Sequence, residues 1–257
     1  MTEAQQAPIS PVNVAADLTM ADLRHALAEG WRDFLTHPLY GLFFGAIYVA
    51  GGLALAWALT SRGASGWLFT AAAGFPLVAP FTAVGLYEVS RRREAGLPLS
   101  WGTVLGALRG RGDDQLLMMG GFIFVGFTFW MILAHGIFAI FMAESGVGSE
   151  SLEVFRTTAG IAMLVVGTAV GAVIAYVFYA VTVISLPMLV DRDVDFLTAI
   201  IKSLRTVQAN GAVMLGWAVV IAAALFAAMI PAFAGLLVIL PVLGHATWHL
   251  YRRVVSG

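Results

Sequence analysis

The sequence has no cysteine and few charged residues, and each shortage excludes a class of protein. Without cysteine the chain cannot form disulfides, thiolate metal sites or a cysteine nucleophile, and its redox compartment stays undetermined. Charged residues make up only 11% of the 257 residues, whereas they make up about a quarter of a soluble globular domain. The formal net charge of −1 argues against nucleic acid as a partner, because a phosphate backbone needs a large basic face.

The sequence also lacks the short motifs of common enzymes. It has no phosphate-cradling glycine loop, no nucleophile elbow and no HExxH motif, so no enzymatic activity is expected. Its first residues contain neither a basic nor an apolar signal region, and a cleaved signal peptide is not expected. Residues 1–18 are small and polar and include prolines, which predicts a disordered cytoplasmic tail.

Apolar residues are abundant and form long blocks. They make up 60% of the chain, and six blocks are long enough to cross a hydrocarbon layer about 30 Å thick. The expected fold class is all-α: a polytopic membrane protein with six transmembrane helices and interfacial amphipathic helices, in one domain over residues 19–257. The expected spans are residues 39–60, 67–90, 116–142, 158–186, 212–230 and 235–251.

Two apolar blocks are too long for a single crossing. The first continues from Thr158 to Val190, so its helix either tilts or leaves the membrane before Pro187. The second would form a helix about 60 Å long at about 1.5 Å per residue. It must fold back, and Pro231 with Gly235 marks the expected turn.

Three shorter segments have apolar residues at helical spacing, which predicts amphipathic helices at the membrane surface. Thr19 and Asp22 resemble a capping box at the start of the first helix, which Pro38 ends. Ser100 is expected to cap the second helix. The predicted apolar face of the third helix consists of Val194, Leu197, Ile201, Leu204 and Gln208.

Lysine and arginine are distributed asymmetrically along the chain. If both termini are cytoplasmic, every Lys and Arg except Arg62 and Arg156 falls on the cytoplasmic side. The positive-inside rule therefore predicts cytoplasmic N- and C-termini. The residues expected to act as topology or lipid anchors are Arg91, Arg92, Arg93, Arg252 and Arg253.

Two of the expected spans resemble each other. Aligning Pro80 with Pro241 without gaps places Glu88 opposite His249 and brings the terminal arginines of both spans into register. Each span belongs to a hairpin preceded by an amphipathic helix. A parallel internal duplication is one interpretation, and chance similarity between two membrane helices is the other.

Ionisable residues inside membrane helices are costly to bury and are therefore candidates for function. Glu88, His245 and His249 make up the candidate polar intramembrane site. Glu88 and His249 could pair and serve a proton relay or a substrate contact; alternatively, Arg91 or Arg92 satisfies Glu88 one turn later. His245 and His249 share a helix face, but no third ligand follows at metal-binding spacing, so neither haem, metal nor another cofactor is expected.

Two further features have simple explanations. Asp191, Asp193 and Asp195 resemble the start of a calcium loop, but Phe196 occupies the position of the required glycine. A surface turn with helix-capping carboxylates is therefore the preferred interpretation. His135 is expected to be a packed or hydrogen-bonded residue rather than a ligand.

Three stretches, FPLVAPFTAVGLYEVSRRRE, LPMLVDRDVDFLTAIIKSLRTVQAN and LPVLGHATWHLYRRVV, resemble an uncharacterised family of bacterial integral membrane proteins. The resemblance extends from about Thr19 over nearly the whole chain, and it implies a bacterial inner-membrane location without an established activity. Some members are labelled cytochrome c oxidase subunit I. That catalytic subunit needs more spans than the six expected and more histidine ligands than the five histidines present, so this chain cannot be that subunit.

The sequence supports two functional hypotheses. The first is a non-catalytic accessory or assembly component that contacts the lipid bilayer and a membrane protein partner, with a respiratory complex as one example. The alternative is a small-solute or ion transporter that uses Glu88 and His249. A water-accessible cavity at mid-depth would favour transport, and a dry, fully packed bundle would oppose it.

Overall fold

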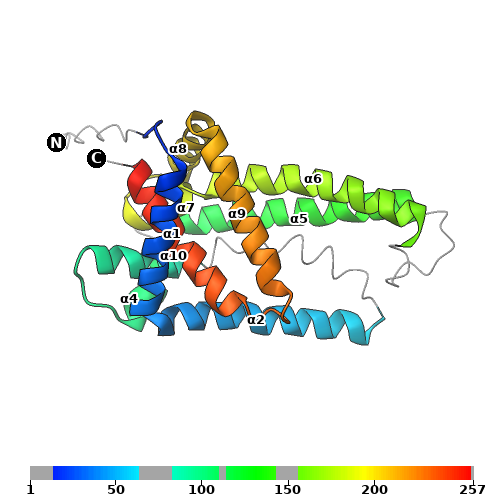
Figure 1. Ribbon diagram of the computed structural model, residues 1–257, viewed down its shortest axis with the longest axis horizontal. Helices are drawn as coiled ribbons and strands as arrows, with labels where there is room; N and C mark the ends of the chain where they lie inside the picture. Colours follow the sequence, from blue (N-terminus) through cyan, green and yellow to red (C-terminus); the bar gives the residue numbers. More distant parts are fainter. Residues whose placement is uncertain (1–13, 64–82, 110–113, 143–155, 256–257) are drawn as a thin grey trace, which may run out of the picture.

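The structure is a computed structural model, which describes residues 14–63, 83–109, 114–142 and 156–255. Within these ranges the chain is helical and contains no strand (Figure 1). Most of the predicted disordered tail and the first part of the predicted span 67–90 lie outside the described residues.

The helices follow one another along the chain with short connections. A helix that covers residues 83–94 is called the 83–94 helix below. The other elements are α1 (Met20–Thr36), α2 (Pro38–Ser61), α4 (Trp101–Gly106), the 3-10 turn η1 (Ala107–Arg109), α5 (Gln115–Met142), α6 (Thr158–Thr182), α7 (Ser185–Asp191), α8 (Phe196–Ala209), α9 (Gly211–Met229) and α10 (Leu236–Val254).

Four helices within the described residues are long and apolar enough to cross a membrane. They agree with four of the six predicted spans, and α2, α5 and α6 run along the long axis of the molecule (Figure 1). These four segments are Pro38–Ser61, Gln115–Met142, Thr158–Asp191 and Gly211–Met229.

Both long apolar blocks are interrupted. In the first, α6 ends at Thr182 and α7 begins at Ser185, so the helix changes before the proline at which it was expected to leave the membrane. In the second, the chain folds back between α9 and α10 as predicted. Ala232 and Phe233 adopt φ angles of 50° and 66° in this turn.

The predicted sixth span corresponds to α10, which differs from the other long helices. Its length and composition do not place it among the candidate membrane helices, and large side chains such as Trp248 and Tyr251 are fully buried. The helices α1, α2, α7 and α9 all contact it. Protein therefore surrounds α10, as expected of a core helix that is covered on every side.

One order of elements occurs three times in the described residues: a short surface helix, a long apolar helix, and a helix with a buried end. The three sets are α1, α2 and the 83–94 helix; α4, α5 and α6–α7; and α8, α9 and α10. Each buried end contacts the surface helix of another set, because α1 packs on α10, α8 on α7 and α4 beside the 83–94 helix. The two ends of the described chain lie together here, where the Ala15 N–H donates to the Val254 carbonyl at 3.0 Å.

The surface helices begin at side-chain caps. The predicted capping box of Thr19 and Asp22 is confirmed at α1, and Ser100 caps α4 as expected. Asp195 accepts a 2.8 Å hydrogen bond from the Thr198 N–H at the start of α8, which agrees with the predicted capping role. The predicted apolar face of α8 partly points outward, while its smaller residues pack against the protein: Ala199, Ile200, Ser203, Thr206 and Val207.

The first surface helix lies very close to the core helix. A Cβ atom added at Gly30 of α1 would stand 2.6 Å from the backbone nitrogen of Ala246 in α10. Only glycine permits this separation between the two backbones. In Figure 1, α1 crosses the end of the bundle and lies beside α10.

Candidate functional site

A carboxylate, Asp33, is buried where α1, the 83–94 helix and α10 meet. It shares one face of α1 with Leu23, Ala26, Gly30 and Phe34, all of which are buried. The Asp33 side chain is fully buried. Because a buried charge is costly unless it is paired, the partners of Asp33 define this site.

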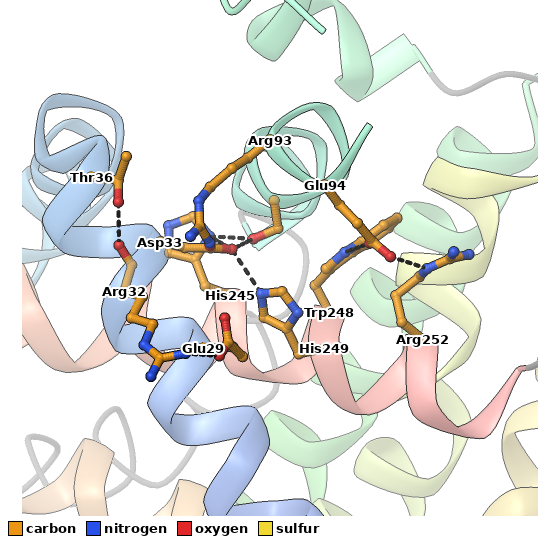
Figure 2. Close-up of polar contacts among 11 residues, drawn as sticks. Glu29, Arg32, Asp33, Thr36, Arg93, Glu94, His245, Trp248, His249 and Arg252 are labelled. Atoms are coloured by element: carbon orange, nitrogen blue, oxygen red, sulfur yellow. Dashed lines mark hydrogen bonds and ion pairs between the residues drawn. The ribbon is translucent and has the colours of Figure 1, made fainter. Parts of the chain in front are cut away.

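The partners come from two other helices. Arg93 forms an ion pair with Asp33 Oδ1, and the Ser90 hydroxyl donates to Asp33 Oδ2. The Nε2 atom of His249 lies 2.9 Å from the same Oδ2 atom. Figure 2 shows Asp33 of α1 between Arg93 and His249. We call Asp33, Ser90, Arg93, His245 and His249 the Asp33 cluster.

His245 joins the cluster through Ser90. Its Nδ1 atom lies 2.7 Å from the Ser90 Oγ atom, and both side chains are fully buried. The only hydroxyl proton of Ser90 goes to Asp33, because an ionised carboxylate can only accept. His245 Nδ1 must therefore carry a proton and donate it to Ser90, while its Nε2 atom has no hydrogen-bond partner among the described residues.

The cluster therefore forms a continuous hydrogen-bond chain between two imidazoles. It runs from His245 through Ser90 and Asp33 to His249, whose Nε2–H donates to the carboxylate. His245 is fully buried, whereas the His249 side chain is 16% exposed. Such a chain can hold three helices together, and it also connects a buried ionisable group to the edge of the protein.

The structure places the predicted site residues in two groups. His245 and His249 belong to the Asp33 cluster. Glu88 instead accepts hydrogen bonds of 2.7 Å from both Nε and Nη2 of Arg91 and pairs with Arg92 at 3.0 Å. This is the arginine alternative for Glu88 that the sequence left open.

Metal ligation has no geometric support in the described part of the chain. There, no group of three or more His, Cys, Asp or Glu side chains is arranged to hold a metal ion. His135, in the third predicted span, lies with its Nδ1 atom 3.2 Å from the Met131 carbonyl of its own helix.

The last turns of α10 are attached to the neighbouring helices by a second set of polar contacts. Glu94 accepts from the Trp248 indole at 3.1 Å and from Arg252 at 3.0 Å, the second of which is drawn in Figure 2. Asp191 accepts a 2.8 Å bond from the Tyr251 hydroxyl. The aspartate turn thus contributes Asp191 to this network instead of a calcium site.

Arg253 connects α10 to the start of α1. It forms ion pairs with Asp17 at 3.2 Å and with Asp22 at 2.9 Å. The Thr19 hydroxyl, together with Arg253, lowers the pKa of Asp22 below its ordinary value. The predicted anchor Arg253 therefore also ties the two ends of the described chain to each other.

Asp33 and Ser90 are absent from the site predicted from the sequence. Asp33 has a recognisable signal, because it is an acidic residue on the apolar face of an amphipathic helix, where burial is costly. Ser90 has no comparable signal, since a single serine in an apolar run commonly bonds its own helix backbone.

Long apolar helices with a paired polar network at one end define an α-helical integral membrane protein. Residues 68–191 match the family described as predicted integral membrane protein (DUF2189). This segment therefore belongs to a family of unknown function, and the resemblance seen in the sequence is confirmed for it. The matched range contains the first of the three stretches and only the start of the second. No curated protein and no solved structure matches the chain.

Proposed function

We propose that the protein is a non-catalytic accessory or assembly component of the bacterial inner membrane, which binds a partner protein within the bilayer. One observation carries this proposal: the apolar helices have little cover from their own chain. In their most apolar windows, only 11% of the residues of α2 and α6–α7 are buried inside the protein, and 22% of those of α5 and α9. Helices of another membrane protein can cover such surfaces.

The outer face of α6 has a feature that suits such a contact. Gly171 receives the ring of Trp130 from α5, which would lie 2.9 Å from an added Cβ atom. Gly167, one turn earlier on α6, has nothing within 4 Å of that position. Small residues let the backbone of a neighbouring helix approach closely, and we assign the partner contact to the face around Gly167.

Native extraction tests the accessory role. The tagged full chain is released from its own membrane in polymer nanodiscs, and the mass and the composition of the particles are measured. We expect one partner at fixed stoichiometry with the wild type and with the matched control Gly51→Leu, since Gly51 of α2 also faces open space. Gly167→Leu should remove that partner. Recovery of the chain alone, or the same partner with every variant, would contradict the proposal.

The first partner to examine is a respiratory oxidase, because the family resemblance carries that label. The expected result is an oxidase subunit in the wild-type particles. If a different membrane protein is recovered at fixed stoichiometry, the accessory role stands and the respiratory assignment fails.

We further propose six crossings with both termini in the cytoplasm. The Ala15–Val254 hydrogen bond supports an even number of crossings, because the joined chain ends must share one side. The absence of cysteine makes a direct test simple. An impermeant maleimide applied to spheroplasts should label Arg62→Cys and leave Ala16→Cys unlabelled until the membrane is opened. The reverse pattern would overturn the orientation.

A second candidate function is transport of a small solute or ion coupled to protons. The buried Asp33 cluster favours it, since ionisable groups inside membrane proteins commonly mark proton or ion pathways. The predicted Glu88–His249 relay would then be replaced by the chain from His245 through Ser90 and Asp33 to His249.

Proton flux into proteoliposomes separates the two functions. Transport predicts a flux driven by a pH gradient that is greatly reduced in Asp33→Asn and retained in Asp193→Asn, which changes an exposed aspartate. The accessory role predicts that liposomes with the protein are no more permeable to protons than liposomes without it.

A further inference from the structure

A pocket of about 220 Å³ opens between three helices at the end of the bundle where the chain ends meet. The 83–94 helix forms one wall, α4 the second and α7 the third. The lining residues that matter are Glu88, Arg91, Arg92, Thr103, Gly106 and Val190. The pocket lies apart from the outer face of α6, so its role is independent of the partner contact proposed above.

The pocket has a surplus of positive charge. Arg91 and Arg92 both pair with the single carboxylate of Glu88, and their side chains are only 14% and 17% exposed. One carboxylate compensates one guanidinium, and each guanidinium has five N–H donors. Arginines with unused donors in a partly buried cavity are suited to a phosphate group, which they bind through two parallel hydrogen bonds.

The position of α4 indicates where the ligand comes from. Trp101 packs on Tyr40 and Phe43, with ring centroids 4.4 and 5.0 Å apart, beside the start of the candidate span α2. Trp101 and two leucines of α4–η1, Leu105 and Leu108, are exposed. Tryptophan at the end of a membrane helix is typical of the headgroup level, so the pocket opens where phospholipid phosphates lie.

We propose that this pocket binds the phosphate of an anionic phospholipid headgroup. The guanidinium groups of Arg91 and Arg92 hold the phosphate, while Glu88 keeps both side chains in position. The acyl chains of the lipid then lie along the exposed leucines of α4–η1. The arginines of this span are thus a built lipid site in addition to their predicted role as topology anchors.

Gly106 provides a test that leaves the arginines in place. An added Cβ atom at Gly106 meets nothing within 4 Å, so a leucine there can fill the pocket without a clash. Gly102 of the same helix is the matched control, since its nearest neighbour would be the Ser100 Oγ atom at 3.9 Å, and it does not line the pocket.

The experiment measures binding of phosphatidylglycerol, phosphatidylcholine and inorganic phosphate to the purified full chain by native mass spectrometry and by thermal shift. We expect tight binding of phosphatidylglycerol alone. Gly106→Leu and Arg92→Gln should each weaken it by about tenfold or more, as loss of a charge-assisted hydrogen bond does. Gly102→Leu should bind as the wild type does, and Arg92→Lys should recover part of the affinity.

Three results would overturn this proposal. Equal binding of phosphatidylcholine would show that headgroup charge is not recognised, and equal binding of inorganic phosphate would assign the pocket to a soluble ligand. Unchanged phosphatidylglycerol binding by a folded Gly106→Leu variant would place the lipid elsewhere. In Arg92→Gln, Glu88 keeps its two hydrogen bonds from Arg91, so a loss of binding there is not explained by unfolding of the span.

Discussion

The hydroxyl of Ser90 joins Asp33 to His245: it donates to the carboxylate of Asp33 and lies 2.7 Å from Nδ1 of His245. The three residues belong to three different helices and are separated by long stretches of sequence. All three side chains are buried, so water does not compete for these bonds and the low local dielectric strengthens them. This contact fixes the surface helix α1 on the core helix α10.

The charge of Asp33 should be essential for stability. Asp33→Asn removes the ion pair with Arg93 and the charged acceptor of His249. Loss of one partner from a buried pair costs about 3–5 kcal/mol, and we expect about 3 kcal/mol because Arg93 is 32% exposed and can turn toward water. Unfolding of the full chain in micelles measures the change. Asp193→Asn, at an exposed aspartate, should stay within about 0.5 kcal/mol of the wild type.

Ser90 should transmit the coupling between Asp33 and His245. Ser90→Ala leaves Nδ1 of His245 without this acceptor, at a cost of about 1–3 kcal/mol. A double-mutant cycle of Asp33→Asn and His245→Gln should give an interaction energy of about 1 kcal/mol with serine at position 90. The same cycle with alanine at that position should give a value near zero. An equal interaction energy in both backgrounds would show that the two residues interact directly.

Two glycines should respond to alanine with opposite signs. A Cβ atom at Gly30 would lie 2.6 Å from the Ala246 nitrogen and 2.7 Å from the Val242 carbonyl oxygen, whereas at Gly51 it meets nothing within 4 Å. Gly30→Ala should therefore separate α1 from α10 and destabilise the protein by about 1–3 kcal/mol. Gly51→Ala should stabilise its helix by about 0.5–1 kcal/mol. Unfolding midpoints measured in the same detergent compare the two, and a shift in the same direction for both would contradict the close α1–α10 contact.

Periodicity and length predicted the helices well, because apolar blocks and caps act locally. The capping box at Thr19, the turn after α9 and the ends of α2 and α5 all agree with the sequence pattern. The environment of α10 could not be predicted this way, since an apolar helix reads the same whether lipid or protein covers it. Its burial depends on α1, α2, α7 and α9, which meet it only in three dimensions.

The candidate site was predicted in part for the same reason. Histidines in an apolar run are visible in the sequence, and His245 and His249 do lie in a polar cluster. Their partner was not visible, because the alignment of two similar spans suggested Glu88 while the structure supplies Asp33 from a surface helix. Arg91 and Arg92, one turn from Glu88, satisfy it locally. Local pairs can be expected from spacing, and pairs between distant helices need the fold.

Acid should weaken the attachment of α1 to the end of α10. Asp22 accepts from the Thr19 hydroxyl at 2.7 Å and from Arg253 at 2.9 Å, and these contacts lower its pKa below the ordinary value of 3.8. The unfolded chain therefore takes up a proton at a higher pH than the folded chain does. Its stabilising effect is complete well above pH 3.8 and is lost as the pH falls through the lower pKa of the folded state.

The variant Asp22→Asn tests this dependence. At neutral pH it should unfold more easily than the wild type by about 1 kcal/mol, as loss of a helix cap does. Below pH 3.8 the two proteins should converge, because both then carry a neutral side chain at position 22. Unfolding curves of both proteins over this pH range measure the difference. If the difference stayed constant with pH, the contribution of Asp22 would come from its shape and not from its charge, and the contact with Arg253 would add nothing to the stability of the α1–α10 pair.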